Sequence, residues 1–421
     1  MPCIPEGGHP KTSRDLNKEE LENILSSDET GFQIQEEKMG NASQSLTTTT
    51  FNPGESVHIV IKETMNDAPS WFRWIHSTQR AFYRECLWYK VSIHLLAEAW
   101  PIIHDLSPKC YYAYHNYKLS LDKPWIWRNK EVRPPHDSLR ELDEERKGKR
   151  TVALSALRSL GHFHGIWWQF LNRKNPKFNY TPGLTPEDYK YHFNTQDDSR
   201  MFLQWFKPFF KMYGGICRTH LSEPEGPDLE RRILAYFKTG KLFDLTQRTL
   251  LNTSKEKSLF KTMVHGDSWR NNMLWRPSDN HVVLIDYQGQ MMAHPGRDFW
   301  YFIYSSSDKS WRDKHLESCK TEYFRVYSSY LDKTEGLDFE SFNDELEELR
   351  GASLMMSMCV EVISKYPKEF NKQSLFILGK DYKEAFKTLQ APPAPSDHPS
   401  LNVIRDRLID TARDLRDLNV I

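Results

Sequence analysis

Apolar and polar residues alternate in several short runs near the start of the chain, which is the spacing of β-strands. Val57, Ile59 and Ile61 would line one face of such a strand. Turn residues at 40–43 and 52–55 bound these runs. Because a stretch with helical spacing follows, the pattern predicts a small strand-rich unit that carries one principal helix.

Helical spacing dominates the chain after residue 150. The apolar stripe of 152–167 predicts a helix that faces a core, and a Pro-rich break at 391–399 precedes a last amphipathic helix near Leu401. The expected fold class is α+β. The expected parts are a tail with a first helix (1–27), a small unit (28–125), a Pro- and charge-rich connection (126–150), a helical unit (151–390) and a linker with a C-terminal helix (391–421).

Residues 264–290 predict a β-hairpin. A mostly apolar run starts at Asn272, turn residues occupy 276–280, and an apolar, β-branched run follows them. An antiparallel hairpin folds the start of its first strand back beside the end of its second. Asn272 and Asp286 would then lie at the same end, with Asp267 just before them.

These three polar side chains suit phosphoryl transfer from a nucleotide. That reaction needs metal ions on the phosphates and a carboxylate that orients or deprotonates the attacking hydroxyl. Asp267 would face the acceptor hydroxyl. Asn272 and Asp286 would bind magnesium, because hard cations prefer oxygen ligands.

Other residues of the same segment have expected supporting roles. His265 is expected to pack and hydrogen-bond behind the loop. Trp269 and Arg270 lie inside the loop and would contact the acceptor, although Trp269 is equally explained as a packing anchor. Asp298 begins a predicted helix, where it would either hold the loop through backbone N–H groups, which we favour, or simply be a negative charge at a helix start.

The small unit contains a complementary pair of charges. Lys62 ends the alternating strand and Glu85 lies within the helix that follows. A lysine held by a helix glutamate is how kinase folds aim an ammonium group at the phosphates. Val60, two residues before Lys62 on the same face, would contact adenine. Each residue alone is more often structural, so the prediction depends on their combination with the hairpin.

Composition narrows the function classes. The 57 basic and 57 acidic residues cancel, which gives no indication of a nucleic-acid partner. The six cysteines are scattered without a CxxC pair, which fits a reducing compartment, so a cytoplasmic protein is expected. No secretory signal is evident at the start and no run approaches the roughly 18 apolar residues of a membrane span.

Several motifs together resemble the ecdysteroid kinase-like family, also called CHK kinase-like, within the aminoglycoside phosphotransferase and choline kinase superfamily. The resemblance covers roughly residues 30 to 390. The residues that carry it are PKCYYA (108–113), Phe82 with Glu85 and Trp88-Tyr89, LGHFHG (160–165), HGDSWRNNML (265–274), IDYQ (285–288) and HPGRDFWYF (294–302).

The resemblance implies a bilobal protein-kinase-like fold, with a small strand-rich N-lobe and a large, mainly helical C-lobe. It implies that the protein phosphorylates a hydroxyl of a small molecule with ATP and Mg²⁺. Asp267 would be the base, Asn272 and Asp286 the metal ligands, and Lys62 with Glu85 the pair that positions the phosphates. Steroid alcohols and xenobiotics are the acceptor classes it suggests, with a role in detoxification.

Two segments depart from the family pattern. The lobe connection contains PWIWRNKEV (124–132) where the family has an apolar run that ends in Glu-Asp-Leu. The nucleotide loop, with Gly40, Asn41 and Ser43, resembles the family's loop but is poorer in glycine than GxGxxG. Gly40, Asn41 and Ser43 are nonetheless the expected phosphate contacts, and no residue of the connection is assigned to adenine.

Three other functions compete with this hypothesis. A kinase-like binding protein without phosphotransfer would explain the unusual connection, but it has no chemical need for the catalytic residues. A two-metal phosphoesterase needs more ligands than His281 and His294 nearby supply. A protein kinase needs a peptide-docking segment, yet only 12 positions separate Asp286 from Asp298. The short gap favours a small-molecule acceptor, and the neutral charge with many aromatic residues favours an apolar alcohol.

Overall fold

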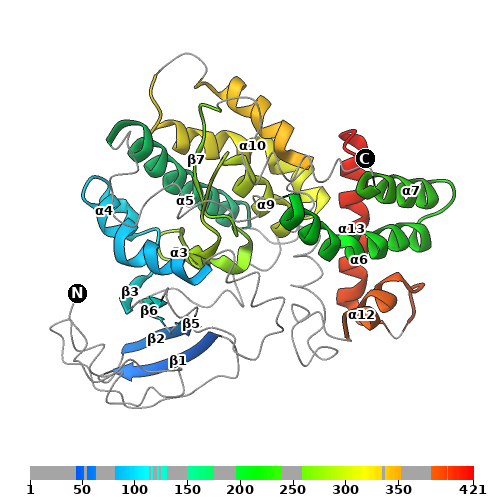
Figure 1. Cartoon of the computed structure of the whole chain (residues 1–421), viewed down its shortest axis with the longest axis horizontal. Helices are drawn as coiled ribbons and strands as arrows, with labels where there is room; N and C mark the ends of the chain where they lie inside the picture. Colours follow the sequence, from blue (N-terminus) through cyan, green and yellow to red (C-terminus); the bar gives the residue numbers. More distant parts are fainter. Residues whose placement is uncertain are drawn as a thin grey trace.

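The computed structural model is mostly helical with a few short strands (Figure 1). It describes residues 44–51, 55–62, 81–112, 115–116, 121–122, 125–129, 149–174, 196–238, 258–333, 337–351, 381–395 and 397–421. No helix within these ranges is long and apolar enough to cross a membrane.

A four-stranded antiparallel sheet forms near the start of the chain. Its order is β1 (Gln44–Phe51), β2 (Glu55–Lys62), β6 (Trp125–Asn129) and β3 (Lys109–Tyr112). The hairpin of β1 and β2 pairs Gln44 with Lys62 and Phe51 with Glu55, so the alternating strand predicted around Ile59 is confirmed. A separate two-stranded ladder joins β4 (His115–Asn116) and β5 (Leu121–Asp122).

Most of strand β6 lies within residues 126–150, which the sequence analysis assigned to the connection. β6 pairs with both β2 and β3, so the sheet extends to Asn129. Proline and charged residues around it favour a loop, but Trp125, Ile126 and Trp127 are residue types that suit a pleated surface. The backbone pairing of β6 on both edges stabilises it as a strand, although the composition of the neighbouring positions favours a loop.

One helical stretch follows the hairpin of β1 and β2 among the described residues. It runs through α3 (Ala81–Leu87), a π-helical turn η2 (Trp88–Ser92) and α4 (Ile93–Ala97). A 3-10 turn η3 (Pro101–His104) ends it. This is the predicted principal helix.

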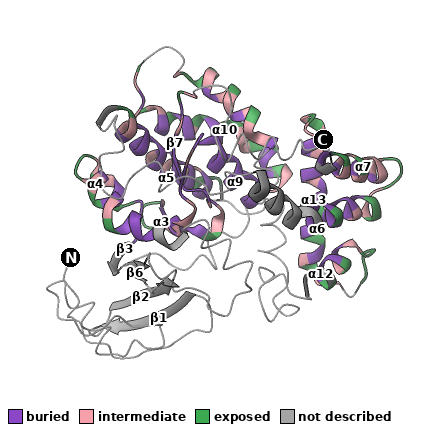
Figure 2. Cartoon of the chain, in the orientation of Figure 1, coloured by how far each residue is buried: buried purple, intermediate pink, exposed green. Residues whose placement is uncertain are grey.

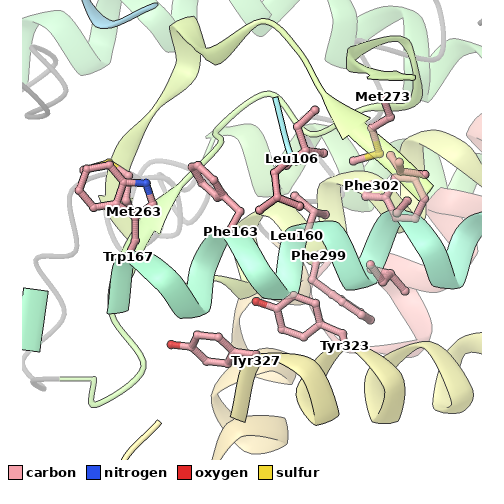
Figure 3. Packing of buried hydrophobic residues seen from close by; sticks show 14 of the residues in the cluster. Leu106, Leu160, Phe163, Trp167, Met263, Met273, Phe299, Phe302, Tyr323 and Tyr327 are labelled. Carbon is pink, nitrogen blue, oxygen red and sulfur yellow. The ribbon is translucent and has the colours of Figure 1, made fainter. Parts of the chain in front are cut away.

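The main core lies where α5 (Lys149–Gln169), α9 (Gly296–Ser306) and α10 (Lys309–Ser328) meet the hairpin predicted within residues 264–290, and Figure 2 shows buried residues concentrated there. Leu160, Phe163 and Trp167 of α5 are fully buried in it, which confirms the predicted apolar stripe. Figure 3 shows them with Phe299 and Tyr323 from the other two helices. Burying each such side chain contributes roughly 1.5–3 kcal/mol. A π-helical extension, η5 (Phe170–Lys174), follows α5.

A second hydrophobic cluster joins four further helices, which Figure 1 shows grouped together. They are α6 (Gln196–His220), α7 (Glu225–Lys238), α12 (Asp381–Gln390) and α13 (Pro399–Asp417). The last is the amphipathic helix predicted from Leu401 onward, and its predicted apolar positions Leu401, Ile404, Leu408 and Leu415 are buried.

The β-hairpin predicted within residues 264–290 is confirmed. β8 (Met273–Arg276) pairs with β9 (His281–Leu284), and the Ile285 N–H continues the ladder to the Asn272 carbonyl at 2.9 Å. On either side, β7 (Thr262–Val264) pairs with β10 (Met291–Ala293). Two 3-10 turns complete the segment: η8 (Arg270–Asn272) before β8, and η9 (Tyr287–Gly289) after β9.

Candidate active site

Backbone contact between two loops brings the predicted site residues together. Gly266, just after β7, has a φ of +81°, and a Cβ there would lie 1.9 Å from the carbonyl oxygen of Gly289. Only glycine satisfies both conditions. The loop that carries Asp267 therefore lies directly against the turn that follows Asp286.

Both carboxylate oxygens of Asp267 are held. The Asn272 side-chain amide donates to Asp267 Oδ2 and to its backbone oxygen, each at 2.8 Å. The Tyr301 hydroxyl donates to Oδ1 at 3.0 Å. Asp267 is half-buried and Asn272 is buried. The predicted base thus has a defined orientation, one part of which comes from a residue that the sequence analysis did not select.

Asn272 and Asp286 have the chemistry of a magnesium site. The Nδ2 of Asn272 points at Asp267, and its Oδ1 makes no hydrogen bond with the described residues, so this oxygen is available to a cation. Asp286 is half-buried and adopts a left-handed conformation, with φ 66° and ψ 59°, at a cost of roughly 1–2 kcal/mol. A strained residue of this kind commonly marks a functional site.

The described residues contain no group of three or more His, Cys, Asp or Glu that could enclose a metal ion. Magnesium, however, is usually bound by one or two carboxylates together with water and substrate phosphates. One amide oxygen and one carboxylate therefore fit a magnesium ion that arrives with a nucleotide.

Asp298 holds the backbone of the loop. Its Oδ2 accepts from the His265 N–H at 2.6 Å and its Oδ1 from the Gly266 N–H at 2.9 Å. The Ser268 hydroxyl donates to its backbone oxygen at 2.9 Å. Burial would raise the pKa of Asp298, but hydrogen bonds from His164 and the loop hold it below its ordinary value. Of the two expected roles of Asp298, these contacts favour the brace.

His164 of α5 is a further member that sequence reasoning did not select, although it lies in the LGHFHG motif. Its Nε2 contacts Asp298 Oδ2 at 3.0 Å and its Nδ1 contacts the Tyr323 hydroxyl at 2.6 Å. All three side chains are fully buried. A histidine on the apolar face of a helix is a weak signal, because it usually only marks a hydrogen-bonded core position.

His265 lies behind the loop, where it was expected. Its Nε2–H donates to the Ile285 carbonyl at 2.9 Å, and its Nδ1 accepts from the Asp267 N–H at 3.3 Å. Burial lowers the pKa of His265, which keeps the ring neutral. The neutral ring links the Asp267 loop to the end of β9.

Tyr287, directly after Asp286, lies in turn η9 and packs against the principal helix. Its ring stacks on Trp88 of η2, with centroids 4.3 Å apart and planes at 18°. Its hydroxyl donates to the Leu106 carbonyl at 2.9 Å and accepts from Ser107 at 2.7 Å. Burial raises the pKa of Tyr287, so it stays a neutral donor. The sequence indicated neither aromatic residue as a partner of the other.

The predicted residues of the small unit lie on β2 and α3. Lys62 is the last residue of β2 and Val60 lies two positions before it. Glu85 is fully buried in α3, and the adjacent Arg84 donates to the Gln290 carbonyl at 2.9 Å.

Trp269 and Arg270, in the loop that carries Asp267, are half-buried. The predicted phosphate-loop residues Gly40, Asn41 and Ser43 lie outside the described residues.

Comparison with known proteins identifies the family. The model of the ecdysteroid kinase-like family matches residues 38–336, which confirms the resemblance seen in the motifs. No curated protein sequence matches the chain.

Several solved structures match this chain at low sequence identity and with TM-scores below 0.5. An aminoglycoside phosphotransferase from Alicyclobacillus acidocaldarius is 11% identical with a TM-score of 0.38, covering 92% of this chain and 93% of its own. An ethanolamine kinase from Plasmodium vivax is 11% identical with a TM-score of 0.40, covering 85% and 83%. A macrolide 2'-phosphotransferase from Brachybacterium faecium is 10% identical with a TM-score of 0.41, covering 89% and 98%.

Proposed function

This chain belongs to the ecdysteroid kinase-like family and is a small-molecule kinase, and we propose that it transfers the γ-phosphoryl group of ATP to an alcohol in a magnesium-dependent reaction. The observation that carries the proposal is the convergence of Asp267 and Asn272 at 2.8 Å beside the turn that carries Asp286. Asp267 and Asn272 precede the first strand of the hairpin and Asp286 follows the second, so all three lie at its open end.

Asp267 is the proposed catalytic base. An acceptor hydroxyl that binds beside its carboxylate would be oriented for in-line attack on the phosphorus, and its proton would pass to the carboxylate. A fixed carboxylate suits this work because catalysis of phosphoryl transfer consists almost entirely of positioning and electrostatic stabilisation.

Asn272 Oδ1 and the Asp286 carboxylate would hold magnesium. Bound magnesium would neutralise charge on the phosphates. In the proposed bilobal arrangement, Lys62 would contact the phosphates, Glu85 would hold Lys62, and Val60 would contact adenine. Gly40, Asn41 and Ser43 would complete the phosphate contacts from the small lobe.

The proposed acceptor is an apolar alcohol such as an ecdysteroid-like or xenobiotic molecule, and a role in cytoplasmic detoxification would follow. Equal numbers of basic and acidic residues argue against a polycationic acceptor. Half-buried Trp269 and Arg270 are proposed to contact the acceptor, because they lie in the same loop as the base.

The test is ADP formation by the purified protein with ATP and magnesium. The acceptors are pooled sterols, phenols, glycosides and amino alcohols, each pool run with and without excess EDTA. Acceptor-dependent ADP that disappears with EDTA would support the proposal. Magnesium-dependent ATP binding without ADP from any pool would instead favour a kinase-like binding protein.

A further inference from the structure

Tyr301 contacts the proposed base from an element outside the hairpin. It belongs to α9, is 5% exposed, and its hydroxyl donates to Asp267 Oδ1 at 3.0 Å. We propose that Tyr301 is a positioning residue that fixes the orientation of the Asp267 carboxylate. This inference rests on the proposed function, because it assigns Tyr301 a part in that reaction.

Among the described residues, Asn272 and Tyr301 donate to different oxygens of the Asp267 carboxylate. Asn272 holds Oδ2 and Tyr301 holds Oδ1. The terminal torsion of an aspartate is broad, so one donor alone would leave the carboxylate plane free to turn. Two donors on opposite oxygens define that plane. A catalytic group needs such a fixed orientation, because it must be held within about 0.5 Å of the productive geometry.

Helix α9 is a rigid support for this contact. Every residue of α9 is buried. Asp298, three residues before Tyr301 and therefore on the same side of the helix, accepts from the backbone N–H groups of His265 and Gly266. One helix face thus fixes both the backbone of the loop and the side chain of the base.

The contact leaves room for the acceptor. A carboxylate oxygen has two lone pairs, so the hydrogen bond from Tyr301 does not by itself prevent Oδ1 from accepting from a substrate hydroxyl. A tyrosine hydroxyl is neutral, so it orients the carboxylate without the competing charge of a lysine or arginine. Asp267 keeps its capacity to accept a proton while its direction is set.

A purely structural explanation is that a buried tyrosine hydroxyl needs some acceptor. Tyr301→Phe and Tyr304→Phe separate the two explanations. Tyr304 lies on the same helix and is also buried, but its hydroxyl accepts from Arg350 Nε at 2.7 Å. We expect Tyr301→Phe to lower kcat about tenfold, the lower end for a hydrogen bond to a charged group, with the KM for ATP nearly unchanged. Tyr304→Phe should leave kcat unchanged.

A double-mutant cycle identifies the route of the effect. If Tyr301 acts through the base, Tyr301→Phe will cause no further loss of kcat in the Asp267→Ala protein. The same fractional loss in both backgrounds, or no loss in the native background, would overturn the inference.

A urea-unfolding cycle on the same four proteins tests the contact without substrate. Coupling between the two positions supports the contact, and additive changes overturn it. If the native protein forms no ADP with any acceptor pool, the proposed function fails and the positioning role fails with it, whereas a coupled unfolding cycle would still show the contact. The two failures are therefore distinguishable.

Discussion

Gly266 shows how one backbone position sets the geometry of the site. Its positive φ turns the chain after β7, and its missing side chain lets the Gly289 carbonyl approach. Asp267 on one loop and Asp286 beside the other can then serve one reaction. The position therefore tests whether close contact of the two loops is essential.

Gly266→Ala is expected to lower the free energy of unfolding by more than about 2 kcal/mol and to abolish turnover. The methyl group would meet backbone at 1.9 Å and the new residue would be strained at φ +81°. Gly214→Ala on α6 is the control, because its Cβ would approach the flexible Glu230 side chain at 3.1 Å and the Glu230 Cα only at an ordinary 3.5 Å. Urea unfolding measures both variants, and equal small changes would contradict the explanation.

Residues that share a short segment could be predicted from the sequence, and residues that meet across the fold could not. Asp267, Asn272 and Asp286 lie within 20 positions, where turn chemistry and strand alternation determine which ends meet. Tyr301 contacts Asp267 from 34 positions further along the chain, and His164 contacts Asp298, the residue that holds the loop, from 134 positions before it. No local pattern specifies such a pairing.

At the scale of elements, the principal helix packs against turn η9, which follows Asp286. Trp88 stacks on Tyr287, and its Nε1 donates to Ser107 Oγ at 3.1 Å, which in turn donates to the Tyr287 hydroxyl. The helix that carries Glu85 is therefore fixed against the turn that follows Asp286. Nucleotide binding should depend on this junction.

Trp88→Leu is expected to lower the free energy of unfolding by about 2–4 kcal/mol and to weaken Mg–ATP binding. The loss of volume destabilises the core, and the loss of the stack frees the helix that carries Glu85. Trp311→Leu, at an equally buried tryptophan of α10, should cost similar stability without changing affinity. Calorimetric titration measures the affinity, and equal weakening in both variants would contradict the junction.

Elements with a clear period could be predicted, and those embedded in mixed composition could not. The hairpin of β8 and β9 and the apolar stripe of α5 follow directly from alternation and helical spacing. Strand β6 lies among prolines and charges, so only its pairing with β2 and β3 reveals it. Partners, rather than local preference, stabilise such a strand.

Two histidines, half-buried His162 and buried His294, make the stability of the whole molecule depend on pH. Burial, with the nearby charges of His281, Arg325 and Arg158, lowers the pKa of His162 from 6.5 to about 4. Burial, followed by His164, lowers that of His294 to about 3. The unfolded chain takes up these protons at higher pH than the folded protein.

The free energy of unfolding should therefore decrease as the pH falls from 6.5 towards 4. His162→Gln removes one of the titrating groups and should flatten this decrease, with stability near that of the native protein at pH 8. Urea unfolding at a series of pH values measures the slope. An unchanged slope in the variant would show that His162 titrates alike in both states.

At the scale of the molecule, the central claim is that Asp267 is the base of a magnesium-dependent small-molecule kinase. The most direct test compares Asp267→Ala with Asp279→Ala, measuring transfer of the γ-phosphoryl group to an acceptor and the affinity for Mg–ATP. Asp279 is the matched control because it lies in the exposed turn of the same hairpin, paired with Arg276.

We predict that Asp267→Ala lowers transfer by roughly 100- to 10,000-fold and leaves Mg–ATP affinity close to that of the native protein. Asp279→Ala should transfer at the native rate. Transfer that survives in Asp267→Ala, or falls equally in both variants, would contradict the claim.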